Sequence, residues 1–181
     1  MRAWLKPDRV LPVGGVALTW VALFELNAYW FEFLAVSPYV GWIFLPAALR
    51  VLAVLLFKAR GVLGLFLGAL ITNAPLWGAE WWDALALSAV SALSPALALW
   101  LGSRWMKLEP TLQGLNGRQL LTLSAFAALS SSALHVLLFY AIEHDTPWPN
   151  AILSMTVGDF VGTLMVLYSV YFVMRWLRPK A

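Results

Sequence analysis

Long apolar stretches separated by short polar connections constrain this chain more than any other feature of its sequence. A transmembrane helix needs about 20 mostly apolar residues, and six stretches of the chain approach that length. Of the 181 residues, 62% are hydrophobic and 12% are charged, whereas a soluble domain has about 25% charged residues. We therefore expect an all-α, polytopic membrane protein, with residues 1–181 forming a single integral membrane domain. Its six transmembrane helices are expected at residues 11–33, 40–57, 61–77, 84–105, 119–142 and 148–177. In the second, Pro46 either kinks the helix or marks its true first turn.

The charged residues indicate how the helices are oriented. Apart from Arg50, all Lys and Arg residues fall at the chain ends or at connections on one side of the expected bundle. The connections on the other side carry only acids. By the positive-inside rule both termini are expected to be cytoplasmic. The basic residues are Arg2, Lys6, Arg9, Lys58, Arg60, Arg104, Lys107, Arg118, Arg175, Arg178 and Lys180, and the acids opposite are Glu80, Asp83, Glu143 and Asp145.

Arg50 is the exception, because it lies about ten residues inside the second helix. An arginine at the bilayer centre costs about 2.5–3.5 kcal/mol on insertion scales, so it needs a partner or a water-filled cavity. Asp159 lies about eleven residues inside the sixth helix, which is a similar depth at a rise of ~1.5 Å per residue. We expect the two to form an ion pair, which either locks two helices together or belongs to a functional site.

Three more polar residues lie in the same outer half of the membrane, namely Glu25, Asn73 and His135. Together with the ion pair they are expected to line one pocket that opens outward. Glu25 and Glu32 are seven residues apart and share a helix face, but Glu32 is expected to be a solvated surface residue. An excess of acids suits a cationic or hydrogen-bonding ligand, or a carboxyl kept protonated by burial. If Glu25 instead faced lipid, an accessory structural role would be favoured.

No motif for catalysis or metal binding is found in the sequence. There is no cysteine, which excludes disulfides and thiolate metal sites, and two histidines without carboxylates at ligand spacing make a poor metal site. The basic residues are spaced along the chain rather than gathered in a patch, so nucleic-acid binding is not expected. We expect a protein that is not an enzyme, with no catalytic or metal-binding residues, and we assign no cofactor.

Three short motifs stand out: Phe44-Leu45-Pro46-Ala47-Ala48, the glycine-rich run at residues 64–73, and Gly158-Asp159-Phe160-Val161-Gly162. The last two each contain two glycines four residues apart, a spacing that lets backbones pack closely. The motifs resemble the membrane-associated sensor (MASE-type) domains of bacteria, over roughly residues 40–75 and 150–175. The resemblance implies signal or ligand sensing, in the inner membrane of a bacterium. Such domains usually have more spans and usually precede a kinase or cyclic-dinucleotide output domain, which we do not recognise in these residues.

Two other functions remain open. Six spans in a short chain with an outward polar pocket are similar, in architecture only, to the substrate-capture components of energy-coupling-factor transporters. An accessory subunit of a larger respiratory or photosynthetic complex would equally suit the apolar, aromatic surface. We expect a small sensor-like or ligand-binding module in the lipid bilayer, with a protein partner in the membrane and a small-molecule ligand.

Overall fold

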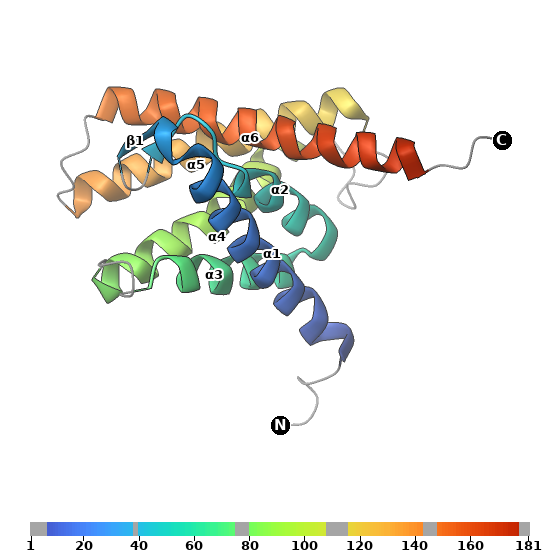
Figure 1. The fold of residues 1–181 in the computed structure, drawn as a ribbon, viewed down its shortest axis with the longest axis horizontal. Helices are drawn as coiled ribbons and strands as arrows, with labels where there is room; N and C mark the ends of the chain where they lie inside the picture. The colour runs from blue at the N-terminus through green and yellow to red at the C-terminus, as the bar shows by residue number, and fades with distance from the viewer. Residues whose placement is uncertain (1–6, 38–39, 75–79, 108–115, 143–147, 178–181) are drawn as a thin grey trace.

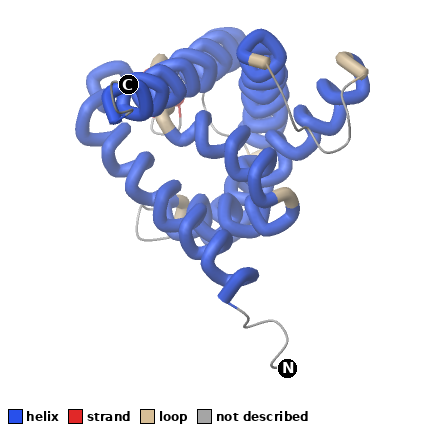
Figure 2. The backbone as a smooth tube through the Cα atoms, turned by 90° about the vertical axis from the view of Figure 1, so that its right-hand side faces the viewer, coloured by secondary structure: helices blue, strands red, loops and turns tan. Residues whose placement is uncertain are grey.

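The computed structural model describes residues 7–37, 40–74, 80–107, 116–142 and 148–177. Six α-helices account for nearly all of this part of the chain, as predicted (Figures 1 and 2). A small antiparallel hairpin lies between the first two helices. In chain order the elements are α1 (Pro7–Phe31), the 3-10 turn η2 (Glu32–Leu34), β1 (Ala35–Ser37), β2 (Val40–Gly41), α2 (Pro46–Phe57), α3 (Ala59–Thr72), α4 (Trp81–Trp105), α5 (Gly117–Ala141) and α6 (Trp148–Leu177).

Four helical segments are long and apolar enough to cross a membrane, which makes this a multi-pass membrane protein in contact with lipid. The remaining two helices, α2 and α3, have only 12 and 14 residues. At ~1.5 Å per residue they are about 18 and 21 Å long, less than the ~30 Å hydrocarbon core. The four long segments are Val10–Leu34, Trp81–Trp105, Gly117–Ala141 and Asn150–Val173.

The two short helices are shorter than the outer predicted bounds. The second helix was expected from about residue 40, with Pro46 either kinking it or marking its true first turn. The structure shows the second alternative, because α2 begins at Pro46 and the chain before it is not helical, and α2 ends at Phe57 as predicted. Proline suits a first helical turn because it has no N–H to satisfy there. The third helix was expected to reach residue 77, but α3 ends at Thr72, with the Asn73 N–H bonded to the Ala69 carbonyl. The two helices meet in the expected tight turn, where Lys58 has a φ of 51°.

The two glycine motifs both serve contacts within the chain, but of different kinds. A Cβ on Gly64 would lie 2.7 Å from the Val16 Cβ, so this glycine lets α1 approach α3. On α6, a Cβ on Gly158 or Gly162 would run into the carbonyls of Gly41 or Phe44. The second motif therefore receives the extended segment that leads into α2, and not another helix.

The helix α2 lies at the centre of the bundle. It contacts each of the other five helices of the described chain, and half of its twelve residues are buried. One apolar cluster around Trp20 and Leu65 joins α1, α2, α3 and α4, and another around Val51 and Leu123 joins α2, α4 and α5. A polar side chain on α2 is therefore surrounded by protein rather than by lipid.

Candidate ligand-binding site

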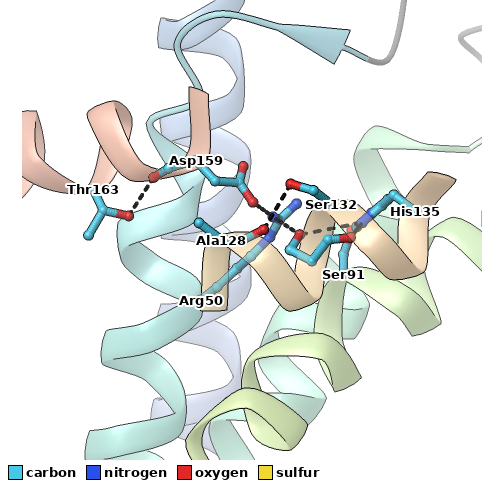
Figure 3. A network of polar contacts seen from close by, with 8 residues as sticks. Arg50, Ser91, Ala128, Ser132, His135, Asp159 and Thr163 are labelled. Atoms are coloured by element: carbon cyan, nitrogen blue, oxygen red, sulfur yellow. Dashed lines mark hydrogen bonds and ion pairs between the residues drawn. The ribbon is translucent and has the colours of Figure 1, made fainter. Parts of the chain in front are cut away.

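Arg50 is held by residues of two other helices. Its Nη1 lies 2.7 Å from the Asp159 Oδ2 on α6 and donates to the Ser131 Oγ on α5 at 2.6 Å (Figure 3). Both charged side chains are only 5% exposed. The expected ion pair is present, and Ser131 is a third member that the sequence did not indicate.

Two aromatic rings complete the surroundings of Arg50. Its Cζ lies 4.9 Å from the centroid of the Phe44 ring and 5.4 Å from that of Trp20, within the ~6 Å range of cation–π attraction. Its Nε is buried and has no hydrogen-bond partner among the described residues. An unsatisfied donor at a buried charge costs free energy.

His135 links α5 to α4. Its Nδ1 lies 2.8 Å from the Ser131 carbonyl oxygen. Because a carbonyl can only accept, we assign the ring proton to Nδ1. In the neutral ring Nε2 is then the acceptor, and the Ser91 Oγ, 3.2 Å away, donates to it. Ser131 thus bonds to both His135 and Arg50.

Polar side chains at the end of α3 are bonded to its neighbours. The Asn73 Nδ2 donates to the Ser88 Oγ of α4 at 3.3 Å. The Trp20 Nε1 of α1 donates to the Thr72 Oγ1 at 3.1 Å, and this hydroxyl donates to the Ala69 carbonyl at 3.0 Å. These bonds join three helices beside the ion pair.

A cavity of about 410 Å³ lies between these groups, within the usual ~300–1,000 Å³ of small-molecule pockets. Arg50 and Asp159 line it at its buried end. Ala28, Glu32 and Ala35 also line it and are exposed, so the cavity reaches the surface near the end of α1. Its polar lining includes Asn27, Thr72, Asn73, Ser91 and His135, and its aromatic lining is Trp20, Phe24, Phe31, Phe44 and Phe139.

Of the two glutamates of the first span, Glu25 lies outside the expected site, whereas Glu32 is exposed as expected but also lines the cavity. Glu25 is exposed and does not line the cavity. On α1 the cavity faces a stripe that includes Trp20, Phe24 and Phe31, and Glu25 is turned about 100° from Phe24. The α-helix ends at Phe31, so Glu32 lies in the 3-10 turn, where the spacing rule for a shared helix face no longer holds.

Several lining residues were missed by reasoning from the sequence. Asn27 and Glu32 were visible as polar residues in an apolar stretch, and that signal could have identified them. Thr72 and Ser91 carry no such signal, because hydroxyl side chains are common in membrane helices, where they bond to the backbone. The same holds for Ser131, which does not line the cavity but bonds to Arg50. Of the five residues proposed for the site, the structure brings Arg50, Asn73, His135 and Asp159 to one cavity and leaves Glu25 outside it.

Within the described residues, no three His, Asp or Glu side chains gather into a set that could hold a metal ion. Compared with known proteins, the chain matches one family model, that of MASE1, over residues 14–181. No curated protein and no solved structure matches it.

Proposed function

Because the chain belongs to the MASE1 family of membrane-associated sensor domains, we propose that it binds a small molecule in the cavity beside Arg50 and Asp159. The observation that carries this proposal is that the 410 Å³ cavity reaches a buried ion pair. A pair that only holds α2 against α6 needs no open volume beside it. The proposed role is sensory rather than catalytic, in keeping with the family.

The position of α2 gives such a ligand a way to act on the whole bundle. A ligand shifts a conformational equilibrium by as much as its affinity differs between two states. A molecule in the cavity would touch Arg50, whose partners Ser131 and Asp159 belong to α5 and α6. Any change in these hydrogen bonds would alter how α2, α5 and α6 pack together. A partner protein in contact with the bundle in the membrane would respond to that change.

We further propose that the chain crosses the bacterial inner membrane six times, with both termini cytoplasmic. The second crossing would combine the extended segment before Pro46 with α2. Non-helical backbone is tolerated at membrane depth where it is buried in protein or lines a cavity. The extended segment meets this condition, because its residues Gly41, Ile43 and Phe44 line the cavity beside Arg50. In Figure 1 the hairpin and the starts of α4 and α6 lie at the left, and the turn from α2 to α3 and the end of α6 lie at the right. This alternation supports the proposal.

An accessory subunit of a larger membrane complex is the second candidate, and the exposure of Glu25 favours it. Glu25 lies within Val10–Leu34, a segment apolar enough to cross the membrane. A charged side chain at the bilayer centre costs about 2.5–3.5 kcal/mol, so a partner that covered Glu25 would remove part of this cost. The sensor remains our first choice, because an accessory role does not account for the cavity.

Replacing either of two alanines on α1 by tryptophan tests whether the cavity holds a molecule. Ala28 lines the cavity mouth, whereas Ala22 is exposed but does not line it. Protein purified in mild detergent should carry a small molecule that native mass spectrometry detects. The Ala28→Trp variant should lose this molecule, and the matched Ala22→Trp variant should keep it. If Ala28→Trp kept the same molecule as the wild type, the cavity would not be its binding site.

A further inference from the structure

We infer that the ligand of this cavity is a hydrophobic organic cation, an amine or quaternary ammonium group on an apolar body, with its charge beside Glu32. The inference rests on the proposed function, since it requires that the cavity binds a small molecule. It follows from the hydrogen-bond donors of the cavity wall, most of which are engaged within the protein, and from the Glu32 carboxylate, which is not paired with any described residue.

Apart from the Arg50 Nε, most hydrogen-bond donors in the cavity wall are already engaged within the protein. The Trp20 indole donates to Thr72, and the Thr72 hydroxyl donates to a backbone carbonyl. The His135 Nδ1 is bonded to the Ser131 carbonyl, and the Ser91 hydroxyl to the other ring nitrogen. A ligand that needed several donors from the wall, such as a carboxylate or a phosphate, would have to break these bonds.

The charge balance of the lining points to the same class. Among the residues that the structure describes, Arg50 is the only lysine or arginine that lines the cavity, and Asp159 neutralises it at 2.7 Å. Glu32 also lines the cavity and has no ion-pair partner among the described residues. The lining therefore has one uncompensated carboxylate, placed where the cavity reaches the surface.

The start of α2 does not offer an anion site either. A helix N-terminus attracts anions through its free N–H groups, but here these groups are engaged. The Leu45 N–H donates to the Asn27 Oδ1 at 2.8 Å, and the Ala47 N–H donates to the Phe44 carbonyl at 3.2 Å. Pro46, between them, has no N–H.

The aromatic walls suit the apolar body of such a cation. The Phe44 ring lies edge-on to Trp20, at 6.0 Å between centroids, and to Phe24, at 6.4 Å. Phe24 and Phe31 line the cavity together with Glu32. A cation near the carboxylate would therefore also lie near aromatic rings, which attract cations.

Three probes of similar shape and different charge test the inference: phenethylammonium, 2-phenylethanol and phenylacetate. Their binding to the full chain in nanodiscs is measured by equilibrium dialysis, with empty nanodiscs subtracted to remove partition into lipid. The cation should bind saturably and about tenfold more tightly than the alcohol, and phenylacetate should bind most weakly. Glu32→Gln should bring the cation down to the affinity of the alcohol, whereas Glu32→Asp and the matched Glu25→Gln should keep the preference.

Each other outcome overturns the inference. Equal binding of cation and alcohol, or an unchanged cation affinity in Glu32→Gln, would remove Glu32 as the recognition group. Tighter binding of phenylacetate would make Arg50 the recognition group, and the cavity would still be a binding site. If none of the probes bound, the ligand class would be wrong. The fate of the native molecule in Ala28→Trp would then show whether the proposed function failed as well.

Discussion

The guanidinium of Arg50 and the carboxylate of Asp159 lie 2.7 Å apart at the centre of the bundle, although 109 residues separate them in the chain. Asp159 follows directly on Gly158, where α6 accepts a hydrogen bond from the Phe44 N–H at 3.0 Å. The same turn of α6 thus holds both the charge on α2 and the extended segment that leads into it. This contact therefore holds α2 against α6, and its residues Phe44, Arg50 and Asp159 also line the cavity.

Removing either charge of the pair should destabilise the protein. Breaking a buried ion pair by removing one partner costs about 3–5 kcal/mol, because the other charge is left uncompensated. Arg50→Gln and Asp159→Asn should each lower the free energy of unfolding by this amount, and the double variant should recover part of the loss. Chemical unfolding in detergent micelles measures all three.

Ser132→Ala is the matched control for these variants. Its hydroxyl donates to the Ala128 carbonyl in the same helix, beside the pair but not part of it. We expect a change within about 0.5–1.5 kcal/mol, the net value of one hydrogen bond. Losses in the double variant equal to the sum of the single losses would show that the two charges are not coupled.

A methyl group on α6 should prevent the approach of the extended segment. A Cβ at position 162 would run into the Phe44 carbonyl and lie 2.9 Å from the Leu45 nitrogen. Gly162→Ala should therefore cost about 1–3 kcal/mol, as overpacking typically does. Gly14→Ala is the control, because a Cβ there meets nothing within 4 Å and alanine favours a helix by about 1 kcal/mol. Equal melting temperatures of the two variants would contradict the close contact.

Asn27 should contribute to stability through the backbone of another helix. Its side chain accepts from the Leu45 N–H at 2.8 Å, as a helix-capping residue does. Asn27→Ala should lower the free energy of unfolding by about 0.5–2 kcal/mol, seen as a lower melting temperature. Asn27→Asp retains an acceptor and should stay near the wild type. An aspartate variant as unstable as the alanine variant would rule out this role.

The topology can be tested in a chain without cysteine. Glu80 and Lys107 are both exposed, so single cysteines at these positions should be equally reactive once the membrane is opened. In intact cells an impermeant thiol reagent should label the cysteine at position 80 and leave the one at position 107 unlabelled. Labelling of position 107 from outside would reverse the proposed orientation.

The sequence by itself determined the class of the protein and the elements that depend on local pattern. Apolar stretches predicted six helices, and the sixth was predicted with the bounds that the structure shows, at residues 148–177. The pairing of Arg50 with Asp159 was predictable because helical rise per residue is constant. Counting residues from the helix ends therefore gives depth, and two opposite charges at one depth in an apolar bundle have few other partners.

Only the tertiary structure decided which way side chains face and where a helix gives way to extended chain. Glu25 and Glu32 are seven residues apart in the sequence, a spacing that predicts a shared helix face. The rotation of α1 against its neighbours keeps Glu25 out of the cavity, and the end of α1 at Phe31 lets Glu32 line it. The extended segment before Pro46 is held by Asn27 and Gly158, both distant in the chain. Each backbone N–H needs a hydrogen-bond partner, and here a distant residue supplies it in place of a carbonyl one helical turn away. Local sequence pattern therefore cannot decide between a helix and an extended segment at these residues.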